Sequence, residues 1–286
     1  MNNVNLRQPG AQIFVPDGTP DDAALARTTH LAIGAHQDDL EIMAAHGILQ
    51  CYQRDDLWFT GVVVTDGRGS ARTGIYANYS DDRMQKVRAL EQKKAAVIGE
   101  FGAQILLNYP SQAVKNPQAT GVVDDLVQLI AVCAPQTLYT HNLADKHPTH
   151  IGVVVNVIRA LRKLPAEKQP ESVIGCEVWR DLDWLLDQDK VVFDVSNQEG
   201  LQMALLGVFD SQVSGGKRYD LATMGRRRAH ATYHVSHDAD AATGLTFGMD
   251  LTPLIENPAL DIADYAGGYI DRFKDDVIRQ IRAASP

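Results

Sequence analysis

The stretch LAIGAHQDDLEI, residues 31–42, decides the fold. It opens with a run of small and branched apolar side chains that is typical of a buried strand, and the run ends at His36. Asp38, Asp39 and Glu41 then follow within five residues. Carboxylates this close repel one another, and each is costly to bury without a cation or hydrogen-bond donors. The stretch is therefore either a solvated loop at the end of a strand or a place where a cation compensates the charge.

Short apolar runs alternate with segments of helical periodicity after this stretch. The expected strands are residues 30–35, 58–65, 104–107, 137–140, 172–179 and 191–195. The expected helices are residues 39–54, 82–101, 121–133, 148–164, 198–211 and 261–284. Strands separated by helices of this length form right-handed crossovers and a mostly parallel sheet. The pattern predicts an α/β fold, a Rossmann-like three-layer sandwich with an irregular C-terminal extension.

The same pattern divides the chain into three parts. Residues 1–27 are polar and punctuated by prolines, which indicates an N-terminal extension. Residues 28–211 carry the strand–helix alternation and form the core. Residues 212–286 are expected to complete the same domain, with residues 215–254 mixed and rich in loops.

Composition excludes several classes of protein. The 286 residues carry a net charge of −9, which argues against nucleic-acid binding. The one basic run, residues 226–228, is expected on a solvated helix face. No signal-peptide core and no apolar run of about 18 residues occurs, which predicts a cytoplasmic protein without membrane insertion. Cys51, Cys133 and Cys176 are scattered among apolar neighbours and are expected to be buried thiols.

Two spaced pairs of side chains indicate a metal site. His36 and Asp39 are three residues apart, and so are His147 and His150. Each pair begins a predicted helix after a predicted strand, and the carboxyl ends of parallel strands meet at one edge of a sheet. Two imidazole nitrogens and one carboxylate oxygen suit zinc with a fourth position left open. Both spacings also occur by chance in many helices, so structural histidines are the alternative.

Four strings resemble, in order, the successive motifs of the PIG-L/LmbE-like de-N-acetylase family. They are GAHQDDLEI, VVVTDGRGS, VRALEQKKAAVIG and THNLADKHPTHIGV, and the likeness covers about residues 28–210. The resemblance implies a metal-dependent N-deacetylase that removes an N-acetyl group from an amino sugar or a GlcNAc-containing glycoconjugate, by attack of a metal-bound water. It also implies that homo-oligomers are common.

The resemblance implies a role for individual residues. His36, Asp39 and His150 match the ligands of Zn²⁺, with another divalent transition metal as the alternative. Asp38 matches the general base. His147 matches the histidine that stabilises the oxyanion or protonates the leaving amine. Either Asp38 or His147 could deliver the proton to the amine.

Further residues are expected to hold the substrate or brace the site. Arg88 matches a family arginine that points into the cleft. Asp66 follows the second strand and is expected to contact a sugar hydroxyl. Glu41 closes the first motif and is expected to brace its loop.

The sequence departs from the family pattern at two positions of the motifs. Gln37 stands where the family usually has proline, and Thr149 stands where many members have an aspartate that orients a histidine. Asp145 or Asp66 could take over the orienting role.

Two other functions remain open at this stage. One is an amidase that uses the same site on a different amide, such as a thiol conjugate. The other is a non-catalytic sugar-binding Rossmann protein, although such a protein has no need of an acid beside the metal ligands.

Overall fold

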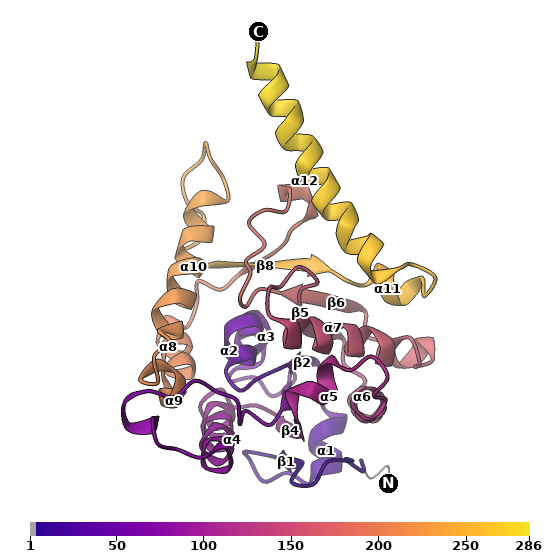
Figure 1. Cartoon of the computed structure of the whole chain (residues 1–286), viewed down its shortest axis with the longest axis vertical. Coiled ribbons are helices and arrows are strands. Elements are labelled where there is room, and N and C mark those ends of the chain that lie inside the picture. Colours follow the sequence, from indigo (N-terminus) through magenta and orange to yellow (C-terminus); the bar gives the residue numbers. More distant parts are fainter. Residues whose placement is uncertain (1–3) are drawn as a thin grey trace.

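The computed structural model describes residues 4–286 (Figure 1). It contains one eight-stranded sheet with the strand order β1-β4-β3-β2-β5-β6-β8-β7. The strands are β1 (Gln12–Phe14), β2 (His30–Gly34), β3 (Phe59–Thr65), β4 (Ala103–Tyr109), β5 (Thr137–His141), β6 (Ser172–Cys176), β7 (Val191–Asp194) and β8 (Leu245–Asp250). The pairs within β4-β3-β2-β5-β6 are parallel. The pairs β1–β4, β6–β8 and β8–β7 are antiparallel. The sheet is therefore mostly parallel, as the sequence predicts.

Helices cover both faces of the sheet. They are α1 (Asp21–Ala26), α2 (Asp39–Met43), α3 (Ala45–Cys51), α4 (Asp81–Ile98), α5 (Ser111–Lys115), α6 (Gly121–Cys133), α7 (Pro148–Leu161), α8 (Glu199–Gly207), α9 (Asp210–Val213), α10 (Tyr219–Tyr233), α11 (Pro253–Glu256) and α12 (Ile262–Ala284). Side chains of α1, α6 and α7 form one buried cluster with the sheet, and side chains of α2, α3, α4 and α8 form a second. Two cores separated by one sheet make the three-layer α/β sandwich that the alternation predicts.

The expected helix over residues 39–54 is two helices, α2 and α3, with a break at Ala44. The break has a physical cause in Arg227. Its guanidinium donates to the carbonyl oxygens of Glu41 and Ile42, at 2.9 and 3.1 Å, where a continuous helix would use backbone N–H groups. The helix therefore ends early because a buried cation takes its last carbonyls.

The prediction of a loop-rich segment over residues 215–254 is wrong. This segment contains α10 and β8, and β8 lies between β6 and β7 in the sheet. Residues 4–27, within the expected N-terminal extension, also contribute structure, since β1 pairs with β4 and Leu25 of α1 is buried. Both segments become ordered through contacts with distant parts of the chain.

The carboxyl ends of the central strands lie on one edge of the sheet. β2 ends at Gly34, its neighbour β3 ends at Thr65, and β5 on the other side ends at His141. The loops that follow these strands carry the candidate site. In residues 4–286, no helix is both long and apolar enough to cross a membrane.

Candidate active site

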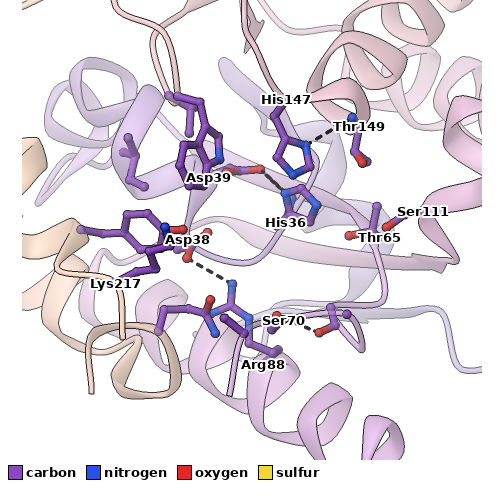
Figure 2. Close-up of a pocket in the computed structure, with 18 of the residues that line it drawn as sticks. His36, Asp38, Asp39, Thr65, Ser70, Arg88, Ser111, His147, Thr149 and Lys217 are labelled. Carbon is purple, nitrogen blue, oxygen red and sulfur yellow. Dashed lines mark hydrogen bonds and ion pairs between the residues drawn. The ribbon is translucent and has the colours of Figure 1, made fainter. Parts of the chain in front are cut away.

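A cavity of about 370 Å³ opens where the loops after β2, β3 and β5 meet (Figure 2). His36 and Asp38 come from the loop after β2, and Asp39 begins α2. His147 is the N-cap of α7 and lines the cavity, while His150 lies buried in the first turn of the same helix. The structure thus brings together the two pairs that the sequence places far apart.

The three expected metal ligands lie at mutual distances that suit one ion. His36 Nδ1 is 3.2 Å from Asp39 Oδ2 and 3.2 Å from His150 Nε2. His150 Nε2 is 3.4 Å from Asp39 Oδ2. Donors at zinc-bond length around a tetrahedral ion are separated by about 3.3 Å. The donor types and their spacing therefore fit zinc.

Two further side chains extend this cluster. His141 Nε2 lies 3.5 Å from Asp39 Oδ2, and the ring of His141 stacks on that of His150 with centroids 3.8 Å apart. His141 Nε2 also accepts the N–H of Ala35 at 2.9 Å, so this nitrogen is already occupied. His147 offers a ring nitrogen within 4.8 Å of donors on His36 and His150.

Asp145 holds the histidines in place. Its Oδ2 lies 3.4 Å from His150 Nδ1, and its Oδ1 accepts the N–H of His147 at 2.8 Å. The same carboxylate accepts the N–H of Trp179 at 3.0 Å, which connects the cavity wall to the two histidines. Of the two acids that could replace the missing family aspartate at Thr149, Asp145 is the one in contact.

Asp38 adopts a backbone conformation that is rare for an L-residue. Its φ is 96°, in the left-handed region, and such a conformation costs free energy that the surroundings must supply. Gln92 Oε1 accepts the N–H of Asp38 at 3.2 Å, and Arg88 Nη2 donates to the carbonyl of Gln37. Helix α4 therefore fixes the loop so that Asp38 faces the cavity.

The Asp38 carboxyl is paired with Arg88. Its Oδ2 is 3.2 Å from Arg88 Nη2, and both side chains are buried (Figure 2). Burial raises the pKa of Asp38 to about 6, against the opposing effect of Arg88, and repulsion from Asp39 adds to the rise. Arg88 lines the cavity as expected, but its guanidinium forms ion pairs with the carboxylates of Asp38 and, at 3.6 Å, of Glu91.

Asp39 and His147 have their pKa values lowered by their surroundings, with opposite effects on their charge. Burial opposes ionisation of Asp39, yet the imidazoles of His150, His36 and His141 hold its pKa well below the usual value. Burial, with His150 and His36 nearby, lowers the pKa of His147 to about 4. His147 Nδ1 accepts the N–H of Thr149 at 3.3 Å, which leaves the ring proton of the neutral form on Nε2.

The structure does not bring Asp66 to the cavity lining in the described part of the chain. Its carboxylate accepts from Arg68 Nε at 2.6 Å and from the Arg68 N–H at 3.2 Å. Gly67 beside it has a φ of +70°, and a Cβ there would lie 2.4 Å from Gln37 Oε1. The positive φ favours glycine at this position, and the absence of a side chain lets the loop pass close to Gln37.

Part of the cavity wall comes from segments without a recognisable motif. Trp179 follows β6, and Gln212 lies in α9. Tyr219 begins α10, and Lys217 comes two residues before this helix. The ring of Trp179 stacks on His147 with centroids 6.1 Å apart. Sequence reasoning missed these residues because no pattern links them to the histidines.

Glu41 and Arg227 are buried next to the cavity-lining residues of α2 and support this helix. Glu41 accepts from Gln92 Nε2 at 2.8 Å, and burial raises the pKa of Glu41 to about 8. This agrees with the expected bracing role. Arg227 is 3% exposed, so the expectation that residues 226–228 form a solvated helix face is wrong for its central member.

Comparisons with known proteins match part of this chain to a family and most of it to solved structures. Residues 31–161 match the family model described as PIG-L: GlcNAc-PI de-N-acetylase. The resemblance to the PIG-L family is confirmed over this segment. No curated protein matches the sequence.

Solved structures share the fold at low sequence identity. A conserved protein of Thermus thermophilus matches with a TM-score of 0.61 and 16% identity, over 82% of this chain and 99% of that chain. The N,N'-diacetylchitobiose deacetylase of Pyrococcus horikoshii matches with a TM-score of 0.62 and 15% identity, over 83% of this chain and 88% of that chain. GalB, a 4-carboxy-2-hydroxymuconate hydratase of Pseudomonas putida, matches with a TM-score of 0.60 and 15% identity, over 78% of this chain and 96% of that chain. The fold thus hosts more than one chemistry, and the reaction must be argued from the site.

Proposed function

We propose that this protein is a zinc-dependent hydrolase that removes an N-acetyl group from an amino sugar or a GlcNAc-containing glycoconjugate. One observation carries the proposal: donor atoms of His36, Asp39 and His150 lie 3.2–3.4 Å from one another at a cavity that Asp38 also lines. The match to the GlcNAc-PI de-N-acetylase family supports the class of substrate.

Amide hydrolysis needs an activated water, stabilisation of the developing oxyanion and a proton for the leaving nitrogen. Zinc held by His36, Asp39 and His150 would supply Lewis acidity to the amide carbonyl and to a water. Asp38 lies next to the ligand Asp39 in the chain, and its carboxylate takes the proton of that water. Arg88, 3.2 Å away, keeps the carboxylate ionised and oriented.

His147 is suited to a different task. Because its Nδ1 accepts the N–H of Thr149, its Nε2–H is free to donate to the carbonyl oxygen as negative charge develops there. His147 then keeps its proton, and Asp38 delivers the proton it has collected to the leaving amine. The hydrogen bond to His147 Nδ1 supports this assignment over delivery of the proton by His147.

The test is a screen of the zinc-loaded protein on N-acetylated sugars with released acetate as the readout. We expect acetate release from N-acetylglucosamine derivatives and none from the protein after chelation. The matched control is the Asp38→Asn variant, which keeps the shape of the side chain and cannot act as a base.

The outcomes separate this proposal from its rivals. Amine release from larger amides, without acetate from any N-acetyl sugar, would favour the amidase. Tight sugar binding without turnover, unchanged by chelation, would favour a binding protein.

A further inference from the structure

We infer that Ile42 and Val178 form a pocket that accepts the acetyl group of the substrate and excludes longer acyl chains. The inference rests on the proposed function and deepens it, because the chemistry of amide hydrolysis does not fix the length of the acyl group. In the described chain, most side chains that line the cavity are polar or charged. Of the aliphatic ones, Ala71 is exposed, whereas Ile42 and Val178 are 7% and 8% exposed. Two buried apolar side chains in a polar cavity suit a small apolar group of the ligand.

Both side chains lie beside groups that are proposed to act on the amide. Ile42 comes three residues after Asp39 in α2, and residues at this spacing lie on the same face of a helix. Val178 precedes Trp179, whose ring stacks on that of His147. The two apolar side chains therefore flank the reacting amide, one beside the ligand Asp39 and the other beside His147.

The structure of an N-acyl sugar determines which part of it meets these side chains. The carbonyl carbon of the amide carries an oxygen, a nitrogen and the acyl chain. The oxygen faces the metal ligands and His147, where its developing charge is stabilised. The nitrogen carries the sugar, whose hydroxyl groups need water or polar partners and therefore face the polar mouth of the cavity. The acyl chain is the remaining substituent, and it points to Ile42 and Val178.

Helix α10 fixes the backbone at both positions. Arg226 Nη1 donates to the carbonyl of Val178 at 2.7 Å. The next residue, Arg227, donates through Nη2 to the carbonyl of Ile42 at 3.1 Å. Adjacent residues of one helix thus hold two segments that are distant in the chain. The separation of the two pocket walls is therefore set by α10, and the pocket resists widening.

Other side chains fill the space behind the pocket. Ile42 and Val178 belong to one buried apolar cluster that also contains Phe209 and Met224. Protein interiors are close-packed, so an acyl chain longer than acetyl has to displace these side chains or shift the backbone. One methylene more or less in such a pocket changes the discrimination between ligands by about 10–200-fold.

The first test measures the binding of hydroxamates to the zinc-loaded protein by calorimetry, because hydroxamates bind zinc and carry an acyl chain of chosen length. We expect the parent to bind acetohydroxamate about 10-fold or more tightly than butanohydroxamate. Ile42→Ala removes three carbon atoms from the pocket wall, and the butanoyl chain is two carbon atoms longer than acetyl. This variant should therefore reverse the preference. Val178→Ala, which removes two carbon atoms, should shift the ratio of the two Kd values in the same direction.

Met43→Ala is the matched control. Met43 is the next residue of α2 and is 1% exposed, but it is not among the residues that line the cavity in the described part of the chain. Its truncation weakens the same helix without enlarging the pocket, so the ratio of the two Kd values should stay that of the parent. The thermal unfolding midpoint of each variant shows that it is folded.

The second test compares the hydrolysis of N-acetylglucosamine and N-butanoylglucosamine. We expect the parent to prefer the acetyl substrate by about 10-fold or more in kcat/KM, and Ile42→Ala to prefer the butanoyl substrate. The expected hydroxamate pattern without hydrolysis of either sugar would support the pocket and contradict the proposed reaction. A parent that binds both hydroxamates equally or binds neither, or folded Ile42→Ala and Val178→Ala variants that keep the parent's ratio, would overturn the inference.

Discussion

Replacing Arg227 with methionine tests whether a buried cation holds the helix that carries the site. Arg227 donates to Gln202 Oε1 at 2.7 Å and to the carbonyls of Glu41 and Ile42. Methionine fills similar space but leaves these three buried acceptors without a donor, at about 1–3 kcal/mol each. Burial lowers the pKa of Arg227 to about 10. The methionine variant no longer buries a charge, and this gain offsets part of the loss. We expect a net destabilisation of about 3 kcal/mol.

The assay is urea unfolding followed by circular dichroism, with Arg228→Met as the matched control. Arg228 is the next residue on the same helix, its side chain is 61% exposed, and it pairs with Glu199 at the surface. Surface pairs contribute about 0–1 kcal/mol, so the control should remain close to the parent. Equal unfolding free energies for the two variants would refute the reasoning.

Three other predictions concern the site and its support. Asp38→Asn should retain zinc and lose turnover by about 10²–10⁴-fold, measured as acetate release, and unchanged turnover would remove Asp38 from the mechanism. Asp145→Ala should weaken zinc binding by about 10–100-fold in a chelator competition, since it orients His150, and an unchanged Kd would contradict this. Burial opposes ionisation of Glu177, but hydrogen bonds from His230 and two backbone N–H groups hold its pKa below the usual value. That ionised carboxylate stabilises the fold above the unfolded-state pKa of about 4.3, and the stability is lost as the pH falls through the lower folded-state value. The unfolding free energy of Glu177→Gln should therefore depend less on pH between neutral and acid, and identical pH curves would contradict the assignment.

The sequence predicts the central sheet and the meeting of the two motif pairs because both depend on local patterns. Apolar runs mark β2, β3 and β5, and parallel strands fix which loops converge. The segment over residues 215–254 has no such pattern. Its helix α10 contains the run Arg226–Arg228, in which one arginine is buried, so charge is a misleading guide there.

The sequence does not predict the strand β8 for a related reason. Gly248 interrupts its apolar character, yet a Cβ at this position would lie 2.5 Å from Ile174, so the glycine is required by close packing of β6. The contacts of Asp145 with His150 and of Arg88 with Asp38 likewise depend on side chains meeting across the fold. Sequence spacing names such residues as candidates but does not choose between them, as Asp145 and Asp66 illustrate.

The central claim is that His36, Asp39 and His150 share one metal ion, and calorimetric zinc titration of the apoprotein tests it most directly. The account predicts about one zinc per chain for the parent and loss of that binding in His150→Ala, with the unfolding midpoint of the apo variant showing that it is folded. A folded His150→Ala variant that binds one zinc with the affinity of the parent would contradict it.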